Sequence, residues 1–289
     1  MTSRTVLRQH PAYRDDIGDL VTRRPLPAPS LPQLDPFLFL NHHGPQIYAP
    51  GNNGLPFGPH PHRGFETVTF ILAGELAHLD SGGHESVIRA GGIQWMTAGS
   101  GLVHAEISPA SFKRDGGPLE ILQLWVNLPA RLKMTPPRYT GVQQAGVPAI
   151  AAADGKAIVH LVSGEFDGRQ GPVESLTGVA MMTVDLAPGA ALTLLAPAGR
   201  TVFLYVVRGD VAVGGTAVKA HHLVELSDGD GVAVSASSDA CLLYGHADPI
   251  GEPMVSRGPF VLNTSQEIVQ AIHDYQAGLF GTVPETVEG

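Results

Sequence analysis

Short runs of β-branched and aromatic residues, each followed by glycine or proline, fill most of the chain from Phe37 onward. Examples are ETVTFIL at 66–72, SVIRA at 86–90 and LEILQLWVNL at 119–128. In an extended strand, alternate positions of such a run share one face and the intervening positions share the other. Runs of this length between turn residues predict β-strands. The chain is therefore expected to be mostly β.

One stretch of this pattern occurs twice. Residues 66–80, ETVTFILAGELAHLD, and 201–215, TVFLYVVRGDVAVGG, each hold an apolar strand, a glycine with an acidic residue after it, and a second strand. Gly209 follows Gly74 by 135 positions. A repeat of this length indicates two copies of one β-barrel unit, because solenoid repeats are shorter. The small-residue stretch 145–156 is expected to connect them, which gives predicted domains 1–144 and 157–289.

One helix is predicted near the C-terminus. Thr264 stands three residues before Glu267, which is the spacing of a capping box. Gly278 suits the end of that helix. The apolar residues between them fall on one helical stripe, namely Ile268, Ala271, Ile272 and Tyr275.

Composition and charge narrow the class of protein. Hydrophobic residues make up 43% of the 289 residues and charged residues 16%, which describes a globular chain. The formal net charge of −9 opposes a broad phosphate-binding face, so no direct nucleic-acid binding is expected. The single cysteine, Cys241, forms no intramolecular disulfide and favours a reducing compartment. The N-terminus lacks the apolar core of a signal peptide, and 178–199, the longest apolar stretch, is interrupted by Asp185 and Pro188. We expect a cytoplasmic protein that does not bind membranes.

Two pairs of polar residues have the spacing of metal ligands. His60 and His62, in GLPFGPHPHRGFE at 54–66, point the same way in a strand, and so do His104 and Glu106 in GSGLVHAE at 99–106. On facing strands the pairs would offer three imidazole nitrogens and one carboxylate oxygen to one ion. Such donors suit Fe(II), Mn, Co, Ni, Cu or Zn. Two open positions on an octahedral ion would make the site catalytic, whereas a closed tetrahedral set would indicate structural zinc.

Longer blocks around these residues resemble a known family. HPHRGFETVTFILAGELAHLD at 60–80, IQWMTAGSGLVHAE at 93–106 and ILQLWVNLP at 121–129 resemble the signature blocks of the pirins, which are bicupins. The resemblance extends from DPFLFL at 35–40 to GPFVLNTSQEIVQAI at 258–272. It implies two jelly-roll β-barrels that face each other, with one mononuclear metal site in the N-terminal barrel. Fe(II) is the ion that we expect there.

The resemblance assigns the carboxylate ligand to Glu106. Glu66 has the strand parity to face inward too, so it is the rival ligand or a partner of one. The sequence departs from the general cupin pattern at two points: seven residues instead of six separate Glu66 from Gly74, and the usual proline of the second motif is absent. At the 135-residue offset, the positions of His60, His62 and Glu66 hold Leu195, Pro197 and Thr201. The C-terminal barrel is therefore expected to bind no metal.

Other residues that carry chemistry are interpreted as structural. We expect four further histidines of the N-terminal half to lie in loops or at the surface, namely His42, His43, His78 and His84. Trp95 and Trp125 are expected in the core, with the alternative that one of them lines the metal pocket. An aromatic wall there would suit a flat substrate.

The resemblance implies two classes of function. Some pirins carry out the quercetin 2,3-dioxygenase reaction, in which a flavonol chelates the ion through its 3-hydroxyl and 4-keto oxygens, dioxygen is added across the ring and carbon monoxide is released. Glu106 would then be both ligand and general base. Pirins also act as metal-containing regulators that contact other proteins, so a non-catalytic regulator with a protein partner is the alternative. A cupin isomerase is a third class, since a fold does not determine a function. We expect a monomeric dioxygenase.

Overall fold

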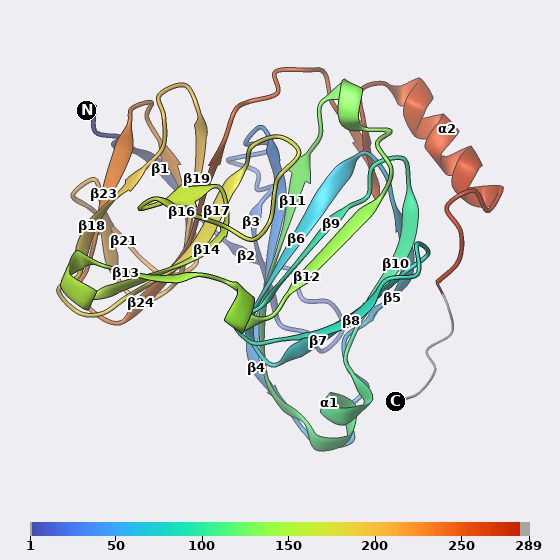
Figure 1. Ribbon diagram of the computed structural model, residues 1–289, viewed down its shortest axis with the longest axis horizontal. Helices are drawn as coiled ribbons and strands as arrows, with labels where there is room; N and C mark the ends of the chain where they lie inside the picture. Colours follow the sequence, from blue (N-terminus) through green and yellow to red (C-terminus); the bar gives the residue numbers. More distant parts are fainter. Residues whose placement is uncertain (1, 284–289) are drawn as a thin grey trace. The chain divides into compact units, whose positions relative to one another are not determined.

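The structure, a computed structural model, describes residues 2–283 (Figure 1). Most of them lie in β-strands, in two cupin domains with a short C-terminal helix, so the predicted fold class is confirmed. Two compact units can be separated. The N-terminal barrel comprises residues 14–22, 38–144 and 250–283, and the C-terminal barrel comprises 2–13, 23–37 and 145–249.

The N-terminal barrel contains two antiparallel sheets. The smaller has the strand order β5-β10-β7-β8, and the larger has the order β12-β9-β6-β11-β4 and continues to β3 and β2. The strands of this barrel are β4 (Phe37–Tyr48), β5 (Phe57–His62), β6 (Phe65–Ala73), β7 (Glu75–Asp80), β8 (Glu85–Arg89), β9 (Ile93–Thr97), β10 (Leu102–Ile107), β11 (Gly117–Asn127) and β12 (Arg138–Val142). The residues of β2 (Tyr13–Arg14) and β3 (Thr22–Leu26) are divided between the two units. A short helix that the sequence pattern did not predict, α1 (Ala110–Asp115), precedes β11.

The C-terminal barrel has the same construction. Its smaller sheet has the order β18-β23-β20-β21, and its larger sheet has the order β1-β22-β19-β24-β17-β14-β13. The strands are β1 (Val6–Pro11), β13 (Ala149–Ala152), β14 (Ala157–Ser163), β17 (Ala180–Leu186), β18 (Ala191–Leu195), β19 (Thr201–Arg208), β20 (Val211–Val213), β21 (Thr216–Val218), β22 (His222–Leu226), β23 (Gly231–Ala236) and β24 (Ala240–Ala247). A separate hairpin is formed by β15 (Glu165–Phe166) and β16 (Arg169–Gln170).

The strand register supports the internal repeat. Thr69 of β6 lies opposite Gln123 of β11, and Leu204 of β19 lies opposite Tyr244 of β24. Leu204 follows Thr69 by the same 135 positions that separate the two repeat glycines. Tyr244 of the C-terminal barrel therefore corresponds to Gln123 of the N-terminal barrel.

The N-terminal end of the chain belongs to the C-terminal barrel, and the C-terminal end belongs to the N-terminal barrel. β1 pairs with β22 in the C-terminal barrel, and β25 (Val255–Arg257) and β26 (Phe260–Leu262) belong to the N-terminal barrel. The division into domains 1–144 and 157–289 therefore stays a prediction, and residues 1 and 284–289 lie outside the described residues. The expected connection 145–156 contains β13, which pairs with β14.

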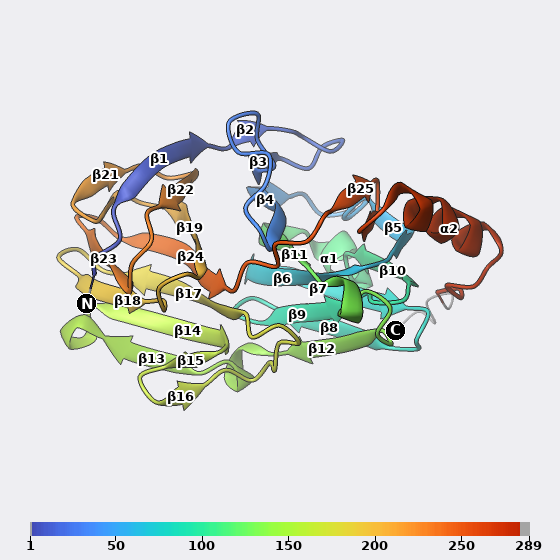
Figure 2. The same ribbon diagram turned by 90° about the horizontal axis from the view of Figure 1, so that it is seen from above.

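The C-terminal helix forms as the capping residues predict. α2 (Ser265–Gln276) follows Thr264, whose side chain accepts a hydrogen bond from the Glu267 amide while the Glu267 side chain accepts one from the Thr264 amide. Both views of the ribbon place α2 beside β10 (Figures 1 and 2). Ile268 and Ala271 of the helix pack in one apolar cluster with Val103 of β10. No helix in residues 2–283 is long and apolar enough to cross a membrane.

The interior of the N-terminal barrel changes from apolar to polar along its strands. Ile71 of β6 and Ile121 of β11 are buried in an apolar cluster. Thr69 of β6 and Gln123 of β11 are each two residues away from these isoleucines, so they face the same interior, and their side chains are polar. The barrel therefore has a packed apolar part and a polar part where chemistry can take place.

Candidate metal centre

Three imidazoles meet where β5 and β10 pair. His60 and His104 are direct partners across this antiparallel pair, and His62 lies two residues further along β5. The Nε2 atoms of His60 and His104 are 2.9 Å apart. One ring nitrogen from each of the three histidines lies within 4.8 Å of the others, which is close enough to hold one ion. The structure thus brings the three predicted histidines together.

Burial keeps two of these imidazoles neutral. His62 is 3% exposed and His104 is 1% exposed. Desolvation, with His60 beside it, lowers the pKa of His62 to about 3. Desolvation and the neighbouring imidazoles likewise lower the pKa of His104 well below its usual range. Neutral imidazole is the form that binds metal ions, so the pair is ready for a cation at neutral pH.

Hydrogen bonds to backbone carbonyls fix the ring tautomers of two histidines. Nδ1 of His60 lies 2.7 Å from the Gly58 carbonyl oxygen, and Nδ1 of His62 lies 3.4 Å from that of Pro259. Only a protonated ring nitrogen donates to a carbonyl, which leaves the Nε2 lone pairs available for coordination. Neutral imidazoles oriented in this way fit a divalent transition-metal ion.

Glu106 lies beside the histidines in a fixed orientation. Its Oε1 accepts a hydrogen bond from Thr69 Oγ1 at 3.0 Å, and its Oε2 accepts one from Gln123 Nε2 at 2.5 Å. Oε2 lies 4.0 Å from His104 Nε2. Trp125 Nε1 donates to Gln123 Oε1 at 3.4 Å, which orients the amide that holds the carboxylate.

Glu66 faces away from the histidines. Thr69, which contacts Glu106, and Phe65, whose ring centroid is 5.0 Å from that of His62, occupy the inward positions of β6, so Glu66 lies on the opposite face. Glu66 Oε1 accepts a hydrogen bond from Thr97 at 2.6 Å, and among the described residues its buried Oε2 has no hydrogen-bond partner. Burial raises the pKa of this carboxyl. The expectation that Glu66 faces inward is wrong.

An aromatic wall stands beside His62. The Trp125 ring centroid lies 5.3 Å from that of His62, and Trp125 also packs on Phe39 at 4.6 Å and Phe65 at 4.5 Å. Trp125 is partly exposed, whereas Trp95 is only 3% exposed and belongs to the core. Trp125 is thus the tryptophan that lines the site.

A buried polar group on β7 was missed in the sequence. His78, expected at the surface, is 1% exposed, and its ring centroid lies 5.5 Å from that of His104. It stacks on Tyr139 at 3.9 Å, and its Nε2 lies 3.0 Å from Asp80 Oδ2. His84, whose side chain is 48% exposed, also contacts Asp80. The sequence did contain a signal for this group: His78 and Asp80 are two residues apart, so their side chains share one face of β7, a strand that pairs with β10.

His42 and His43 are also buried, contrary to the expectation of loop residues. Both lie in β4, and they are 0% and 2% exposed. His42 Nε2 lies 3.0 Å from Glu120 Oε1, and His43 Nδ1 lies 2.8 Å from Thr22 Oγ1. These contacts explain how two polar rings are accommodated in the interior.

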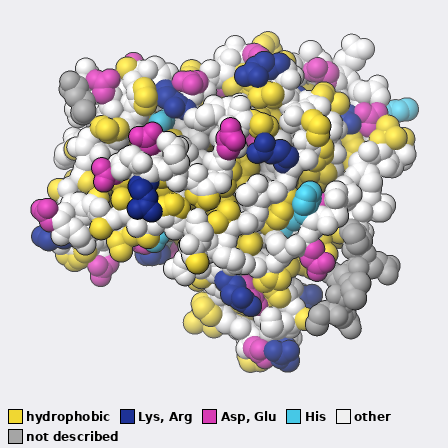
Figure 3. Space-filling model, in the orientation of Figure 1, with side chains coloured by type: hydrophobic (Ala, Val, Ile, Leu, Met, Phe, Trp, Pro, Cys, Tyr) yellow, Lys and Arg dark blue, Asp and Glu magenta, His cyan; other side chains and the backbone are white. Residues whose placement is uncertain are grey.

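Basic side chains do not gather on the face seen in Figure 3. Lys and Arg are scattered among Asp and Glu there and form no continuous area. This distribution agrees with the formal net charge of −9. That face offers no surface of the kind that binds a nucleic-acid backbone.

Comparison with known proteins agrees with the fold. Family models for Pirin and for the Pirin C-terminal cupin domain match residues 19–126 and 181–281. A pirin-like protein of Solanum lycopersicum is 39% identical over 285 residues, which cover 96% of this chain and 93% of that protein. Homo sapiens pirin is 38% identical over 263 residues, which cover 88% of this chain and 86% of that protein.

Solved structures show the same relationship. The crystal structure of a quercetin 2,3-dioxygenase from Acinetobacter baumannii has a TM-score of 0.91 at 33% identity, covering 97% of this chain and 99% of that one. The bacterial pirin YhhW of Escherichia coli, solved in complex with nickel(II), has a TM-score of 0.68 at 23% identity, covering 84% and 99%, and shows the shared fold. The chain belongs to the pirin family.

Proposed function

We propose that this protein is a metal-dependent dioxygenase that acts on flavonols such as quercetin. The observation that carries the proposal is the convergence of three imidazoles, two of them oriented by backbone carbonyls, with a carboxylate held beside them. His60, His62, His104 and Glu106 are the ligands that we assign, with Fe(II) as the ion; the donor set also suits Mn, Co, Ni, Cu or Zn. The similarity to the structure named as a quercetin 2,3-dioxygenase supports the same reaction.

The residues around the site have separate roles in this reaction. When bound, the ion would supply Lewis acidity toward the 3-hydroxyl and 4-keto oxygens of the flavonol and a route for electrons to dioxygen. Glu106 accepts the proton of the 3-hydroxyl. Thr69 and Gln123 each donate a hydrogen bond to one oxygen of Glu106, so the base is held in one orientation before the substrate arrives.

The aromatic wall supports a flat substrate. Trp125 is partly exposed beside His62, and its packing on Phe39 and Phe65 fixes the indole ring. Stacking on a ring that is already immobilised costs little conformational entropy. We assign Trp125 as the surface against which the flavonol rings lie.

The test combines elemental analysis of anaerobically purified protein with oxygen uptake after addition of quercetin. We expect iron near stoichiometry and oxygen consumption with release of carbon monoxide. His60→Ala and His104→Ala should lose the metal, whereas His273→Ala, an exposed histidine of α2, should keep it. Stoichiometric metal in both of the first two variants would refute the ligand assignment.

A conservative substitution at Glu106 separates binding from turnover. Glu106→Gln should abolish turnover while some metal is retained, because an amide can accept a hydrogen bond but is not a base at neutral pH. Unchanged turnover would exclude Glu106 as the base. Metal at stoichiometry without oxygen uptake for quercetin would instead favour the non-catalytic regulator that binds a protein partner.

A further inference from the structure

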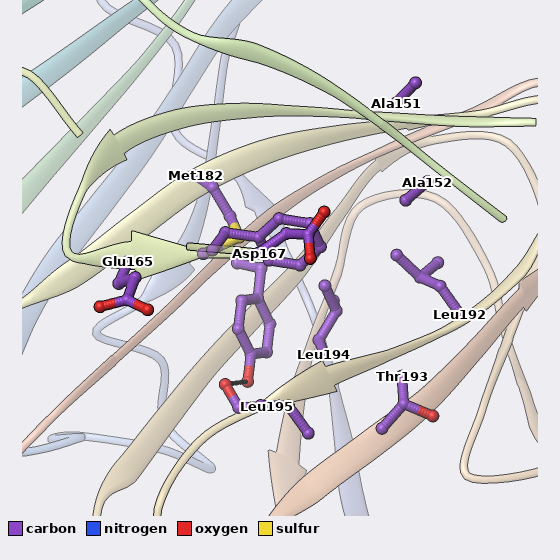
Figure 4. A pocket seen from close by; sticks show the side chains of 11 residues that line it. Ala151, Ala152, Glu165, Asp167, Met182, Leu192, Thr193, Leu194 and Leu195 are labelled. Carbon is purple, nitrogen blue, oxygen red and sulfur yellow. Dashed lines mark hydrogen bonds between the residues drawn. The ribbon is translucent and has the colours of Figure 1, made fainter. Parts of the chain in front are cut away.

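The C-terminal barrel contains an apolar pocket of its own (Figure 4). Its volume is about 450 Å³, within the range of small-molecule sites. The pocket lies between β18, β13 and the β15–β16 hairpin. The apolar side chains that form most of it are Phe166, Met182, Leu192, Leu194, Leu195 and Tyr244.

This pocket corresponds in position to the metal centre of the N-terminal barrel. By strand register, Leu194 takes the position of His60, because it lies opposite Val232 as His60 lies opposite His104, and Tyr244 takes the position of Gln123. The 135-residue offset, which assigns Leu195 to His60, is therefore one residue off in β18. Tyr244 Oη donates a hydrogen bond to the Leu195 carbonyl oxygen at 3.2 Å, drawn dashed in Figure 4. The second barrel has therefore kept a concave site at this position but lines it with apolar side chains.

The apolar lining is not fully covered by the protein itself. Leu195 is 55% exposed, and Phe166 and Leu192 are partly exposed. In Figure 4 the labelled Leu192, Leu194 and Leu195 lie along one strand that borders the pocket. A ligand with a flat apolar body would remove this surface from water, which is the main source of affinity in such sites.

The rim of the pocket adds a charge preference. Glu165 and Asp167, both on the β15–β16 hairpin, line the pocket, and no Lys or Arg among residues 2–283 does so. Gln170 donates a hydrogen bond to Glu165 Oε2 at 2.9 Å and so limits the positions of that carboxylate. Arg169 of the same hairpin is exposed and is not part of the lining. The rim thus attracts cations and repels anions.

We propose that this pocket is a second ligand site, which binds a small aromatic amine. The aromatic body would lie over Leu195 and Tyr244, and the ammonium group would face Glu165 and Asp167. The proposal does not depend on the identity of the ion at the metal centre or on dioxygenase activity.

Two probes with the same ring and opposite charge test the proposal. Tryptamine and indole-3-acetate would be titrated into the full-length protein while the methyl resonance of Met182, which lines the pocket, is followed by NMR. We expect tryptamine to bind about tenfold more tightly than indole-3-acetate, because exposed charge pairs contribute modestly. Equal affinity for the two probes, or no shift at Met182, would overturn the proposal.

Variants separate the apolar and the charged contributions. Leu195→Ser should weaken the binding of both probes, and Glu165→Gln combined with Asp167→Asn should remove the preference for tryptamine. Asp239→Asn, an exposed carboxylate of the same barrel outside the pocket, is the matched control and should preserve the preference. An unchanged preference in the double variant would refute the assigned role of the rim. Sedimentation without probe shows whether the protein self-associates. If it does, and tryptamine competes with that association, the pocket is occupied by a second copy of the chain, which would also refute the proposal.

Discussion

Loosening the C-terminal segment 259–280 should weaken metal binding in the N-terminal barrel. The Pro259 carbonyl oxygen is the partner of His62 Nδ1 at 3.4 Å and also accepts a hydrogen bond from the Arg63 amide at 3.3 Å. The Arg63 carbonyl in turn accepts one from the Val261 amide at 3.1 Å. The orientation of a proposed metal ligand therefore depends on a segment almost two hundred residues away in the sequence.

One side chain fixes this segment to the barrel. Arg63 is buried, with one guanidinium nitrogen 2.7 Å from Asp274 Oδ2 of α2 and its Nε 2.7 Å from the Ser100 carbonyl oxygen. The guanidinium also lies 4.5 Å from the ring centroid of Phe280. Removal of the Asp274 carboxylate would leave the buried cation without its ion-pair partner.

The expected size of the effect follows from these contacts. Loss of one partner of a fully buried pair costs about 3–5 kcal/mol. The Asp274 side chain is 18% exposed, so water replaces part of the interaction, and we expect Asp274→Ala to lower the free energy of unfolding by about 2 kcal/mol. Loss of a partner that orients a ligating histidine lowers metal affinity about 10–100-fold. Asp274→Ala loosens the segment that carries the carbonyl partner of His62 but does not remove that carbonyl. We therefore expect metal affinity to fall by about tenfold, the lower end of this range.

The assay is a competition titration with a chromophoric chelator on anaerobic protein. Val269→Ala, on the same helix at a position that is 59% exposed, is the control and should bind metal as the wild type does. Equal metal affinity in Asp274→Ala and the control, with lowered stability in Asp274→Ala alone, would refute the link between the segment and His62. A wild type that binds no metal would refute the metal site itself, so the two failures are distinguishable.

Two further predictions concern buried charges in the N-terminal barrel. Lys133 Nζ donates hydrogen bonds to the carbonyl oxygens of Gly64 and Val261 and to Asn127, and desolvation lowers its pKa from 10.5 to about 8. Between pH 8 and pH 10.5 the unfolded chain binds more protons at this lysine than the folded chain does. The free energy of unfolding, measured by urea titration, should therefore rise with pH over this range in the wild type and not in Lys133→Met. Burial raises the pKa of Glu66, so its contribution to stability is present at low pH and is lost as pH rises through the folded-state pKa. Glu66→Gln should flatten this fall and leave metal content unchanged; a loss of metal would contradict the orientation described for Glu66.

Local spacing was enough to predict the strands, the repeat and the three histidines. Each of these features depends on residues a few positions apart, where the period of a strand or helix fixes which side chains share a face. Gln123 could not be found in this way, because its contact with Glu106 depends on which strands are neighbours in the barrel. His78 was misjudged for the same reason, since Tyr139, which covers it, arrives on β12.

Few residues separate the proposed metal centre of one barrel from the apolar pocket of the other. In the N-terminal barrel, Gln123 directs an amide N–H at Glu106. In the C-terminal barrel, Tyr244 directs its hydroxyl at the Leu195 carbonyl, so that group is no longer a donor for a carboxylate. A histidine in place of Leu194 would therefore not recreate the proposed centre, because the group that orients the base would still be missing. If both proposals hold, the chemistry of each barrel depends on the pair of inward residues at each register position, and one duplicated barrel supports two different sites.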